Sequence, residues 1–201
     1  MKKQIVLATQ NKHKIAEIKN ILSDIDHLEI LDLSIFPQID PIIENGTTLK
    51  SNALIKAEAV FKHTNILALA DDTGLMVDYL LGAPGVLSAR YAGENVTYQD
   101  NNKKLIKELG GIPPRRRTAR FKCCMALVDN NINKTFETAI EGKIATEPYG
   151  KNGFGYDPIF IPAKYNKTYA ELSDTEKNKI SHRYQSLLLV KDFLRGNYRQ
   201  L

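Results

Sequence analysis

Residues 66–74 read Ile66-Leu67-Ala68-Leu69-Ala70-Asp71-Asp72-Thr73-Gly74. The apolar run from Ile66 to Ala70 predicts a buried strand that ends at Ala70. In open α/β sheets, ligands bind beyond the carboxyl ends of the strands, so the two carboxylates that follow predict a site. Paired carboxylates favour a hard cation, and a hard cation at such a place favours phosphate. From this stretch alone, an ordinary Asp-rich turn is the alternative.

A second apolar run, Gln4-Ile5-Val6-Leu7-Ala8-Thr9, leads into the polar stretch Thr9-Gln10-Asn11-Lys12-His13-Lys14. Apolar residues three and four apart over 15–22 then predict an amphipathic helix, with Asn11 as its N-cap. Lys14 would lie in the first turn, where backbone N–H groups bind anions and a cation is unfavourable unless negative charge lies nearby. The stretch lacks the glycines and the Gly-Lys-Ser/Thr ending of a Walker loop. It predicts phosphate binding by other means, and a solvated surface lysine is the alternative.

Two later segments offer contacts for a flat, polar ligand. Residues 150–158 form a glycine-rich loop, in which Phe154 and Tyr156 could stack on a base or, alternatively, anchor the loop on the core. Residues 177–183 carry several hydrogen-bond donors, which suit carbonyl oxygens and phosphates. They follow a capping box at 173–176. A basic, solvated helix start is the alternative for this segment.

Composition is that of an ordinary globular protein: 201 residues, 43% hydrophobic and 25% charged. No run approaches the roughly 20 apolar residues of a membrane span. The apolar run that follows the first residues is too short for a signal peptide. Cys123 and Cys124 are neighbours in a strand-like segment, so a bridge between them is not expected. We therefore expect a protein of the reducing cytoplasm without a membrane partner.

The net charge of +5 is mild, and its densest part is the run Arg115–Arg117. This run follows two prolines, so a solvated loop is the favoured interpretation and a polyphosphate or nucleic-acid contact the lesser one. Aromatic residues do not alternate with the arginines, so we expect no nucleic-acid partner.

Strands and helices alternate along the chain, which indicates an α/β fold. Asp129-Asn130-Asn131 is a turn signal between two strands, and this hairpin makes the expected sheet mixed. The expected order is strand 4–9, helix 12–23, strand 28–33, helix 48–63, strand 66–70, helix 97–109, strand 121–128, strand 134–144, strand 159–161 and helix 182–195.

Together these segments resemble the inosine triphosphate pyrophosphatase family, and most of all its bacterial members. The matching stretches fall in order from residue 5 to about 194. They are Thr9-Gln10-Asn11-Lys12-His13-Lys14, Glu44-Asn45-Gly46-Thr47-Thr48-Leu49, Asn52-Ala53, Lys56-Ala57, Ala70-Asp71-Asp72-Thr73-Gly74-Leu75, Gly82-Ala83-Pro84-Gly85-Val86-Leu87-Ser88-Ala89-Arg90-Tyr91, Phe154-Gly155-Tyr156-Asp157-Pro158 and Ile180-Ser181-His182-Arg183.

The resemblance implies a single domain over 1–201, with a long mixed central β-sheet flanked by helices and two lobes with the active-site cleft between them. It also implies a homodimer. The implied activity is hydrolysis of non-standard purine nucleoside triphosphates (ITP, dITP and XTP) to the monophosphate and pyrophosphate, by attack of a metal-activated water on the α-phosphorus.

The resemblance further implies a role for individual residues. Asp72 matches the general base and, with Glu44, the ligands of Mg²⁺. Phe154 would stack on the purine, while Asp157, His182 and Arg183 would contact its edge. The full set of implied substrate-binding residues is Thr9, Gln10, Asn11, Lys12, His13, Lys14, Lys56, Thr73, Phe154, Gly155, Tyr156, Asp157, Lys177, His182 and Arg183.

One departure concerns the metal ligands. Ile43 stands where the family usually has a second acidic residue, and Ser51 stands where it often has another Glu. The metal would then rest mainly on Asp72, the substrate and waters, as Mg²⁺ tolerates.

Two other functions remain open on the sequence. One is a nucleotide- or RNA-binding regulatory module, against which the carboxylate pair argues because carboxylates repel phosphate unless a metal intervenes. The other is a nucleotide pyrophosphatase that acts on modified pyrimidines.

Overall fold

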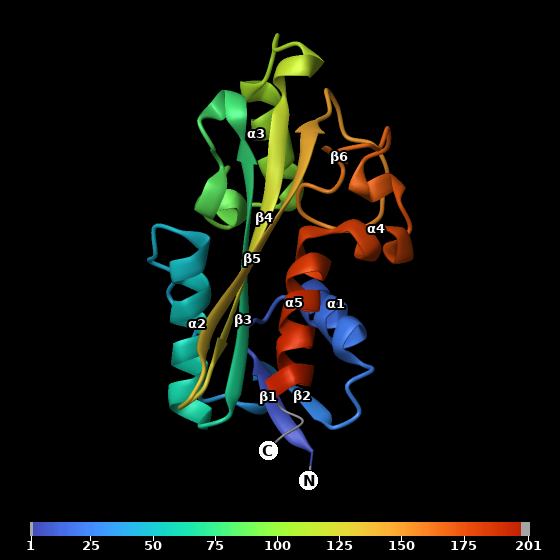
Figure 1. Cartoon of the computed structure of the whole chain (residues 1–201). Coiled ribbons are helices and arrows are strands. Elements are labelled where there is room, and N and C mark those ends of the chain that lie inside the picture. The colour runs from blue at the N-terminus through green and yellow to red at the C-terminus, as the bar shows by residue number, and fades with distance from the viewer. Residues whose placement is uncertain (1, 198–201) are drawn as a thin grey trace. The chain divides into compact units, whose positions relative to one another are not determined.

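The structure is a computed structural model, and it describes residues 2–197. A mixed six-stranded sheet has the order β2-β1-β3-β4-β5-β6 (Figure 1). β1 pairs in parallel with β2 and β3, whereas β5 and β6 are antiparallel. The strands are β1 (Lys3–Leu7), β2 (Leu28–Asp32), β3 (Leu67–Val77), β4 (Thr118–Val128), β5 (Asn133–Ile144) and β6 (Phe160–Pro162). The helices are α1 (Lys12–Leu22), α2 (Leu49–Thr64), α3 (Tyr98–Glu108), α4 (Asp174–Ile180) and α5 (His182–Asn197). The expected α/β class with a mixed sheet flanked by helices is confirmed.

The chain divides into two compact units, which we call unit 1 and unit 2. Unit 1 holds the residues up to Asp72, Cys123–Thr138 and those from Arg183 onward. Unit 2 holds Thr73–Lys122 and Ala139–His182. The strands β3, β4 and β5 contribute residues to both units.

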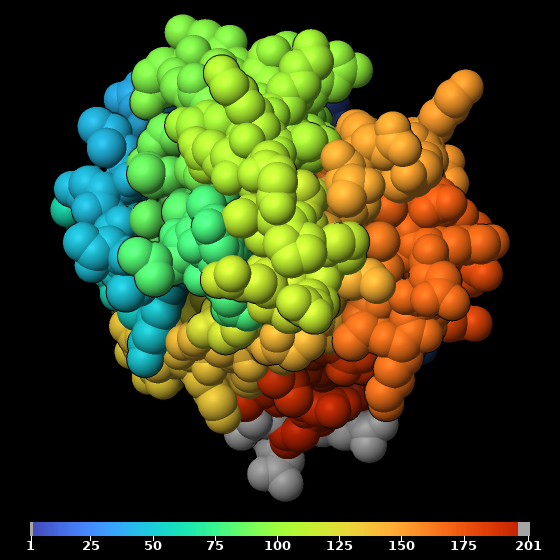
Figure 2. All heavy atoms as spheres, turned by 90° about the horizontal axis from the view of Figure 1, so that it is seen from above, coloured from blue at the N-terminus to red at the C-terminus, as the bar shows by residue number. Residues whose placement is uncertain are grey.

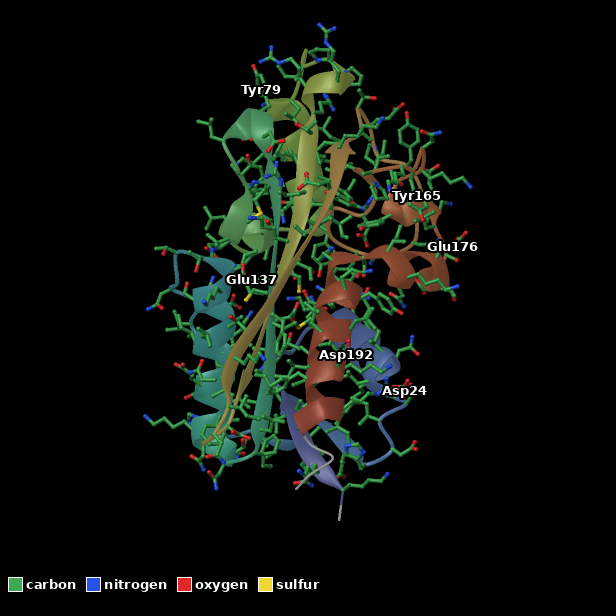
Figure 3. The ribbon with its side chains drawn as sticks, in the orientation of Figure 1. Asp24, Tyr79, Glu137, Tyr165, Glu176 and Asp192 are labelled. Atoms are coloured by element: carbon green, nitrogen blue, oxygen red, sulfur yellow. The ribbon has the colours of Figure 1, made fainter. Side chains whose placement is uncertain are left out.

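In unit 1, helices cover both faces of the sheet: α2 lies on one side of β3, and α1 and α5 lie on the other (Figure 1). Leu67 and Leu69 of β3 share a buried cluster with Leu22 of α1 and Leu187 of α5. Because side chains alternate along a strand, Asp71 continues this face and Asp72 lies on the opposite one. The α1–α5 side is also tied at its surface, where Asp24 pairs with Lys191 and Arg195 of α5 (Figure 3).

Unit 2 has a separate core in which aromatic side chains are prominent. Leu105 of α3 lies in this cluster with Phe121, Phe160 and Tyr169. The ring centroids of Phe121 and Phe160 are 4.7 Å apart, and those of Phe160 and Tyr169 are 5.1 Å apart. Such contacts add to the stabilisation that burial of the rings provides.

The prediction that the strand ends at Ala70 is wrong. β3 continues to Val77, so the Asp71-Asp72-Thr73-Gly74 stretch lies inside the strand. Leu75 and Val77 are fully buried, and their burial extends the alternating pattern past the Thr-Gly turn signal. The two carboxylates are therefore presented on opposite faces of a strand.

Most other expected elements occur within a few residues of their predicted bounds, but α4 was missed as a helix. Its predicted capping box is present: Ser173 accepts from the Glu176 N–H, and Glu176 (labelled in Figure 3) accepts from Ser173. Cys123 and Cys124 are both buried, and no disulfide joins them. None of the helices in residues 2–197 has the length and apolar character needed to cross a membrane.

Candidate active site

The start of α1 brings a cation to the buried carboxylate of Asp71. Asn11 caps the helix, because its Oδ1 accepts from the N–H groups of His13 (3.0 Å) and Lys14 (3.4 Å). The Lys14 ammonium lies 2.9 Å from the Asp71 carboxylate. The negative charge that the sequence required beside Lys14 is thus Asp71, on β3.

Asp71 is the centre of a buried ionic network in unit 1. Its carboxylate lies 3.3 Å from two nitrogens of the Arg183 guanidinium, and Arg183 also pairs with Glu17 of α1 at 2.5 Å. Burial raises the pKa of Asp71, but Lys14, Arg183 and Lys56 outweigh burial and hold it well below its usual range. Asp71 therefore stays ionised, with its charge balanced by its neighbours.

Asp72 has different partners because it lies on the other face of β3. Lys56 of α2 lies between two carboxylates: its Nζ is 3.7 Å from Asp72 and 3.3 Å from Glu44. Burial, reinforced by Glu44, raises the pKa of Asp72, although Lys56 acts in the opposite direction. A carboxylate with a raised pKa is better suited to accept a proton than an ordinary surface Asp.

Asn52 of α2, which sequence reasoning did not include in the site, joins the two metal-ligand candidates. Its Oδ1 accepts from the Gly46 N–H at 2.8 Å, which fastens the loop after Glu44. Its side chain also hydrogen-bonds Asp72, an interaction that lowers the Asp72 pKa. The sequence did contain a signal for Asn52: asparagine is a weak helix former, yet it lies beside Ala53 in a predicted helix. A polar residue on the buried face of a helix needs a hydrogen-bond partner.

The charges around the Asp71-Asp72 pair do not cancel. Within residues 2–197, the recorded ion pairs of this cluster join three cations to four carboxylates: Lys14, Lys56 and Arg183 with Glu17, Glu44, Asp71 and Asp72. The cluster therefore carries a formal charge of about −1 when every group is ionised. Additional positive charge would therefore favour the approach of a polyphosphate.

In unit 2, Asp157 organises the glycine-rich loop. Its Oδ2 accepts from the Phe154 N–H and from Lys177 Nζ, both at 2.8 Å. Gly153 has a φ of +72°, and a Cβ there would lie 2.1 Å from the Asp157 carboxylate. A glycine is thus required at this position for both conformation and space.

The aromatic residues of this loop differ in exposure and contacts. Tyr156 is buried and its hydroxyl donates to the Ser88 carbonyl at 2.9 Å, so it anchors the loop. Phe154 is half-buried: the Lys177 ammonium lies 4.8 Å from its ring centroid, and the Tyr98 ring lies 6.0 Å away. Phe154 is therefore the loop aromatic that can meet a ligand.

His182, the last residue of unit 2, is buried and stacks on Phe121 with centroids 4.5 Å apart. The next residue, Arg183, belongs to unit 1 and contacts Asp71 there. The predicted site residues thus form two groups. Unit 1 holds Thr9, Gln10, Asn11, Lys12, His13, Lys14, Glu44, Lys56, Asp72 and Arg183, and unit 2 holds Thr73, Phe154, Gly155, Tyr156, Asp157, Lys177 and His182.

The arginine run is not simply a solvated loop. Arg117 is buried, and its guanidinium donates to the carbonyls of Leu109 (2.8 Å), Ile112 (3.0 Å) and Ala145 (2.6 Å). It therefore satisfies two carbonyls just after the end of α3 and one just after the end of β5. Arg116 lies over the ring of exposed Tyr79, labelled in Figure 3, with 5.2 Å to the centroid. The segments around Arg116 (yellow-green) and Tyr79 (green) lie on the face of the molecule that Figure 2 shows.

Comparison with known proteins places this architecture in a family. The model of the Ham1 family matches residues 5–193. Two similar proteins are named dITP/XTP pyrophosphatase. That of Thermoanaerobacter pseudethanolicus is 46% identical over 95% of this chain and 96% of its own length, and that of Bacillus subtilis is 47% identical over 96% and 97%.

Solved structures agree with the sequence matches. The Staphylococcus aureus Ham1 protein superimposes with a TM-score of 0.88 at 40% identity, over 96% of this chain and 99% of that one. A HAM1 protein from Coxiella burnetii gives 0.89 at 42% identity, with the same coverage. The resemblance drawn from the ordered motifs is confirmed, and the chain belongs to the Ham1 family.

Proposed function

We propose that this chain is a nucleoside triphosphate pyrophosphatase that hydrolyses non-standard purine nucleotides (ITP, dITP and XTP) to the monophosphate and pyrophosphate. Membership of the Ham1 family and the names of the relatives support this activity. The observation that carries it is the buried Asp72, whose pKa burial raises, next to Lys56 and Glu44. A proton acceptor beside cations is what water attack on a phosphate requires.

We propose Mg²⁺ as the metal. Glu44 and Asp72 supply two carboxylates, which are hard oxygen ligands. Among the described residues, no group of three or more His, Cys, Asp or Glu side chains gathers as a metal site. This fits an ion that keeps several waters and binds substrate phosphates. When bound, Mg²⁺ would neutralise phosphate charge beside a cluster that is itself negative.

The residues of unit 1 would act on the phosphates. Asp72 would take the proton of the water that attacks the α-phosphorus. Lys14 and the capped start of α1, with the neighbouring Thr9–His13, would hold the triphosphate, since a helix N-terminus and an ammonium both attract anions. Thr73 follows Asp72 in the chain, and its hydroxyl would add a phosphate contact on the face of β3 that Asp71 occupies.

The residues of unit 2 would bind the base. Phe154 would stack on the purine, and His182 with the following residue, Arg183, would supply donors for its 6-keto oxygen. Adenine has an amino group at this position, so the hydrogen-bond donors of the protein would face another donor. Unpaired buried polar groups of this kind can discriminate by about 10⁴ or more.

The test is turnover of ITP, XTP, dUTP and ATP, each with and without Mg²⁺, followed by product analysis. We expect Mg²⁺-dependent formation of IMP and pyrophosphate from ITP. Release of IDP and orthophosphate would mean attack at the γ-phosphorus and would contradict the proposal. A preference for dUTP would favour the modified-pyrimidine alternative, and binding without turnover would favour a regulatory module.

We further propose that the enzyme works as a homodimer in the cytoplasm, as the family resemblance implies. Cys123 and Cys124 are not joined in a disulfide, which suits a reducing compartment. Light scattering during size-exclusion chromatography would distinguish a dimer of the 22.6 kDa chain from a monomer.

A further inference from the structure

The ammonium of Lys56 is surrounded by three oxygen atoms of unit 1. It donates to the backbone carbonyl of Asp71 at 2.7 Å and lies 3.3 Å from the Glu44 carboxylate and 3.7 Å from that of Asp72. The Lys56 side chain is 9% exposed. The ammonium therefore donates one hydrogen bond to a carbonyl and lies within ion-pair distance of two carboxylates.

Two of these oxygens belong to the carboxylates that the proposed function assigns to the metal. Mg²⁺ binds oxygen at about 2.1 Å, so it would draw Glu44 and Asp72 toward a point that the ammonium now neighbours. Two cations so close repel each other strongly, and burial limits the screening by solvent. Lys56 and a divalent cation therefore compete for the same two negative charges.

We propose that Lys56 is the internal counter-cation of the Glu44–Asp72 pair, and that a divalent cation binds there in competition with it. This inference rests on the proposed metal site and goes beyond the phosphate contact expected of Lys56. Lys56 would balance the carboxylates while no metal is bound. It would give way when metal arrives, and its charge would then be available to a substrate phosphate. Metal affinity in the absence of nucleotide is consequently weak.

The competition predicts an unusual result: removal of a charged residue from the site should tighten metal binding. In Lys56→Met, the two carboxylates face each other without a cation between them. We expect the dissociation constant for Mn²⁺ without nucleotide to fall by about tenfold, because a full charge within about 4 Å of both ligands is removed. The same titration with Mg²⁺ by calorimetry should move in the same direction.

Lys56→Gln is a second variant, because its amide keeps a donor for the Asp71 carbonyl but has no charge. The matched control is Lys50→Met, on the same helix, where the side chain is exposed. Lys50→Met changes the net charge equally and should leave the Mn²⁺ dissociation constant within about twofold, since exposed charges are screened. Thermal unfolding gives a further readout: Mn²⁺ should raise the melting temperature of the two Lys56 variants more than that of the wild type.

The experiment is a titration of each purified protein with MnCl₂ alone, with free Mn²⁺ measured by electron paramagnetic resonance. Tighter binding in both Lys56 variants, abolished by an added Asp72→Asn, supports the inference. Unchanged or weaker binding in folded Lys56 variants, while Asp72→Asn still abolishes wild-type binding, overturns the counter-cation role and leaves the metal site standing. Binding that survives Asp72→Asn overturns the proposed metal site and this inference with it.

Discussion

The ammonium of Lys14 lies 2.9 Å from the carboxylate of Asp71, although the two residues are 57 positions apart along the chain (71 − 14). Asp71 is 1% exposed, and its carboxylate also pairs with the Arg183 guanidinium. Its negative charge therefore balances one cation from α1 and one from α5. Asp72, the next residue, contacts Lys56 instead. Adjacent carboxylates thus have separate tasks: Asp71 holds the cations in place, and Asp72 is left for the reaction we propose.

Asp71→Asn should destabilise the protein and change how its stability depends on pH. The pKa of Asp71 lies well below its ordinary value of 3.8 in the folded chain, so its ionised form favours folding. That stabilisation is fully present above pH 3.8 and is lost as the pH falls through the lower, folded pKa. We expect a less stable variant at pH 7, and a smaller further loss of stability between pH 4 and pH 2.

Urea unfolding of wild type and variant at several pH values measures this difference. The control is Asp26→Asn, a change of an exposed Asp. A wild-type protein whose stability falls between pH 4 and pH 2 by the same amount as that of Asp71→Asn would contradict the assigned role.

Arg183→Ala should lower stability by about 3–5 kcal/mol, because it removes one of the two cations that pair with the buried Asp71 carboxylate, and the same cation also pairs with Glu17. The Arg183 side chain is 3% exposed and contacts both Asp71 and Glu17. Arg183→Lys keeps the positive charge, but an ammonium lacks the planar guanidinium that contacts Asp71 and Glu17 together. We therefore expect a loss of stability between those of wild type and Arg183→Ala. Unfolding in urea measures both. An Arg183→Ala protein as stable as wild type, altered only in its ITP to ATP ratio, would show that Arg183 serves the base alone.

Local features of this site could be predicted from the sequence, whereas long-range partners could not. The Asn11 cap and the need of Lys14 for a nearby anion depend on residues within one helical turn. The pairing of Arg183 with Glu17 joins residues 166 positions apart, and no local pattern encodes it. Sequence reasoning therefore left Glu17 out, whereas the contact of Arg183 with the base stays a prediction.

The error at β3 has a different cause. Thr73-Gly74 is a turn signal, and turn propensity competes with the burial of apolar residues that follow. Burial prevails here, because Leu75 and Val77 are fully buried in the core of unit 2. Had the strand been extended to Val77, its alternation would have predicted opposite faces for Asp71 and Asp72.

Phe154→Ala should raise the KM for ITP by about tenfold or more with little change in kcat, since base stacking contributes about 1–3 kcal/mol and Phe154 takes no part in the chemistry. Phe154→Leu keeps apolar volume without a flat ring and should recover part of the loss. Tyr149→Ala, at an exposed aromatic residue of the same unit, is the control. Steady-state kinetics decides: equal KM values for wild type and Phe154→Ala would remove Phe154 from the base site.

Arg117→Ala and Arg115→Ala separate structure from surface within the arginine run. Arg117 donates to three backbone carbonyls, and its loss removes all three of these hydrogen bonds from a buried or part-buried setting, so we expect about 2–3 kcal/mol of destabilisation. Arg115 is exposed, and its loss should stay within about 0.5 kcal/mol. Neither should change kcat. Thermal and urea unfolding measure the contrast, and equal stability of the two variants would refute it.

Asp72→Asn should abolish turnover while leaving the fold intact. Asn is nearly isosteric, so packing on β3 should survive, but it cannot accept a proton from water at neutral pH. Loss of a general base costs about 10²–10⁴ in rate, and the weaker metal ligand should add to that. Asp71→Asn is the comparison, with a smaller defect in kcat. The measurement is kcat at saturating Mg²⁺ and ITP, with circular dichroism to verify folding. A folded Asp72→Asn enzyme that keeps more than about a tenth of the wild-type kcat would exclude Asp72 as the base.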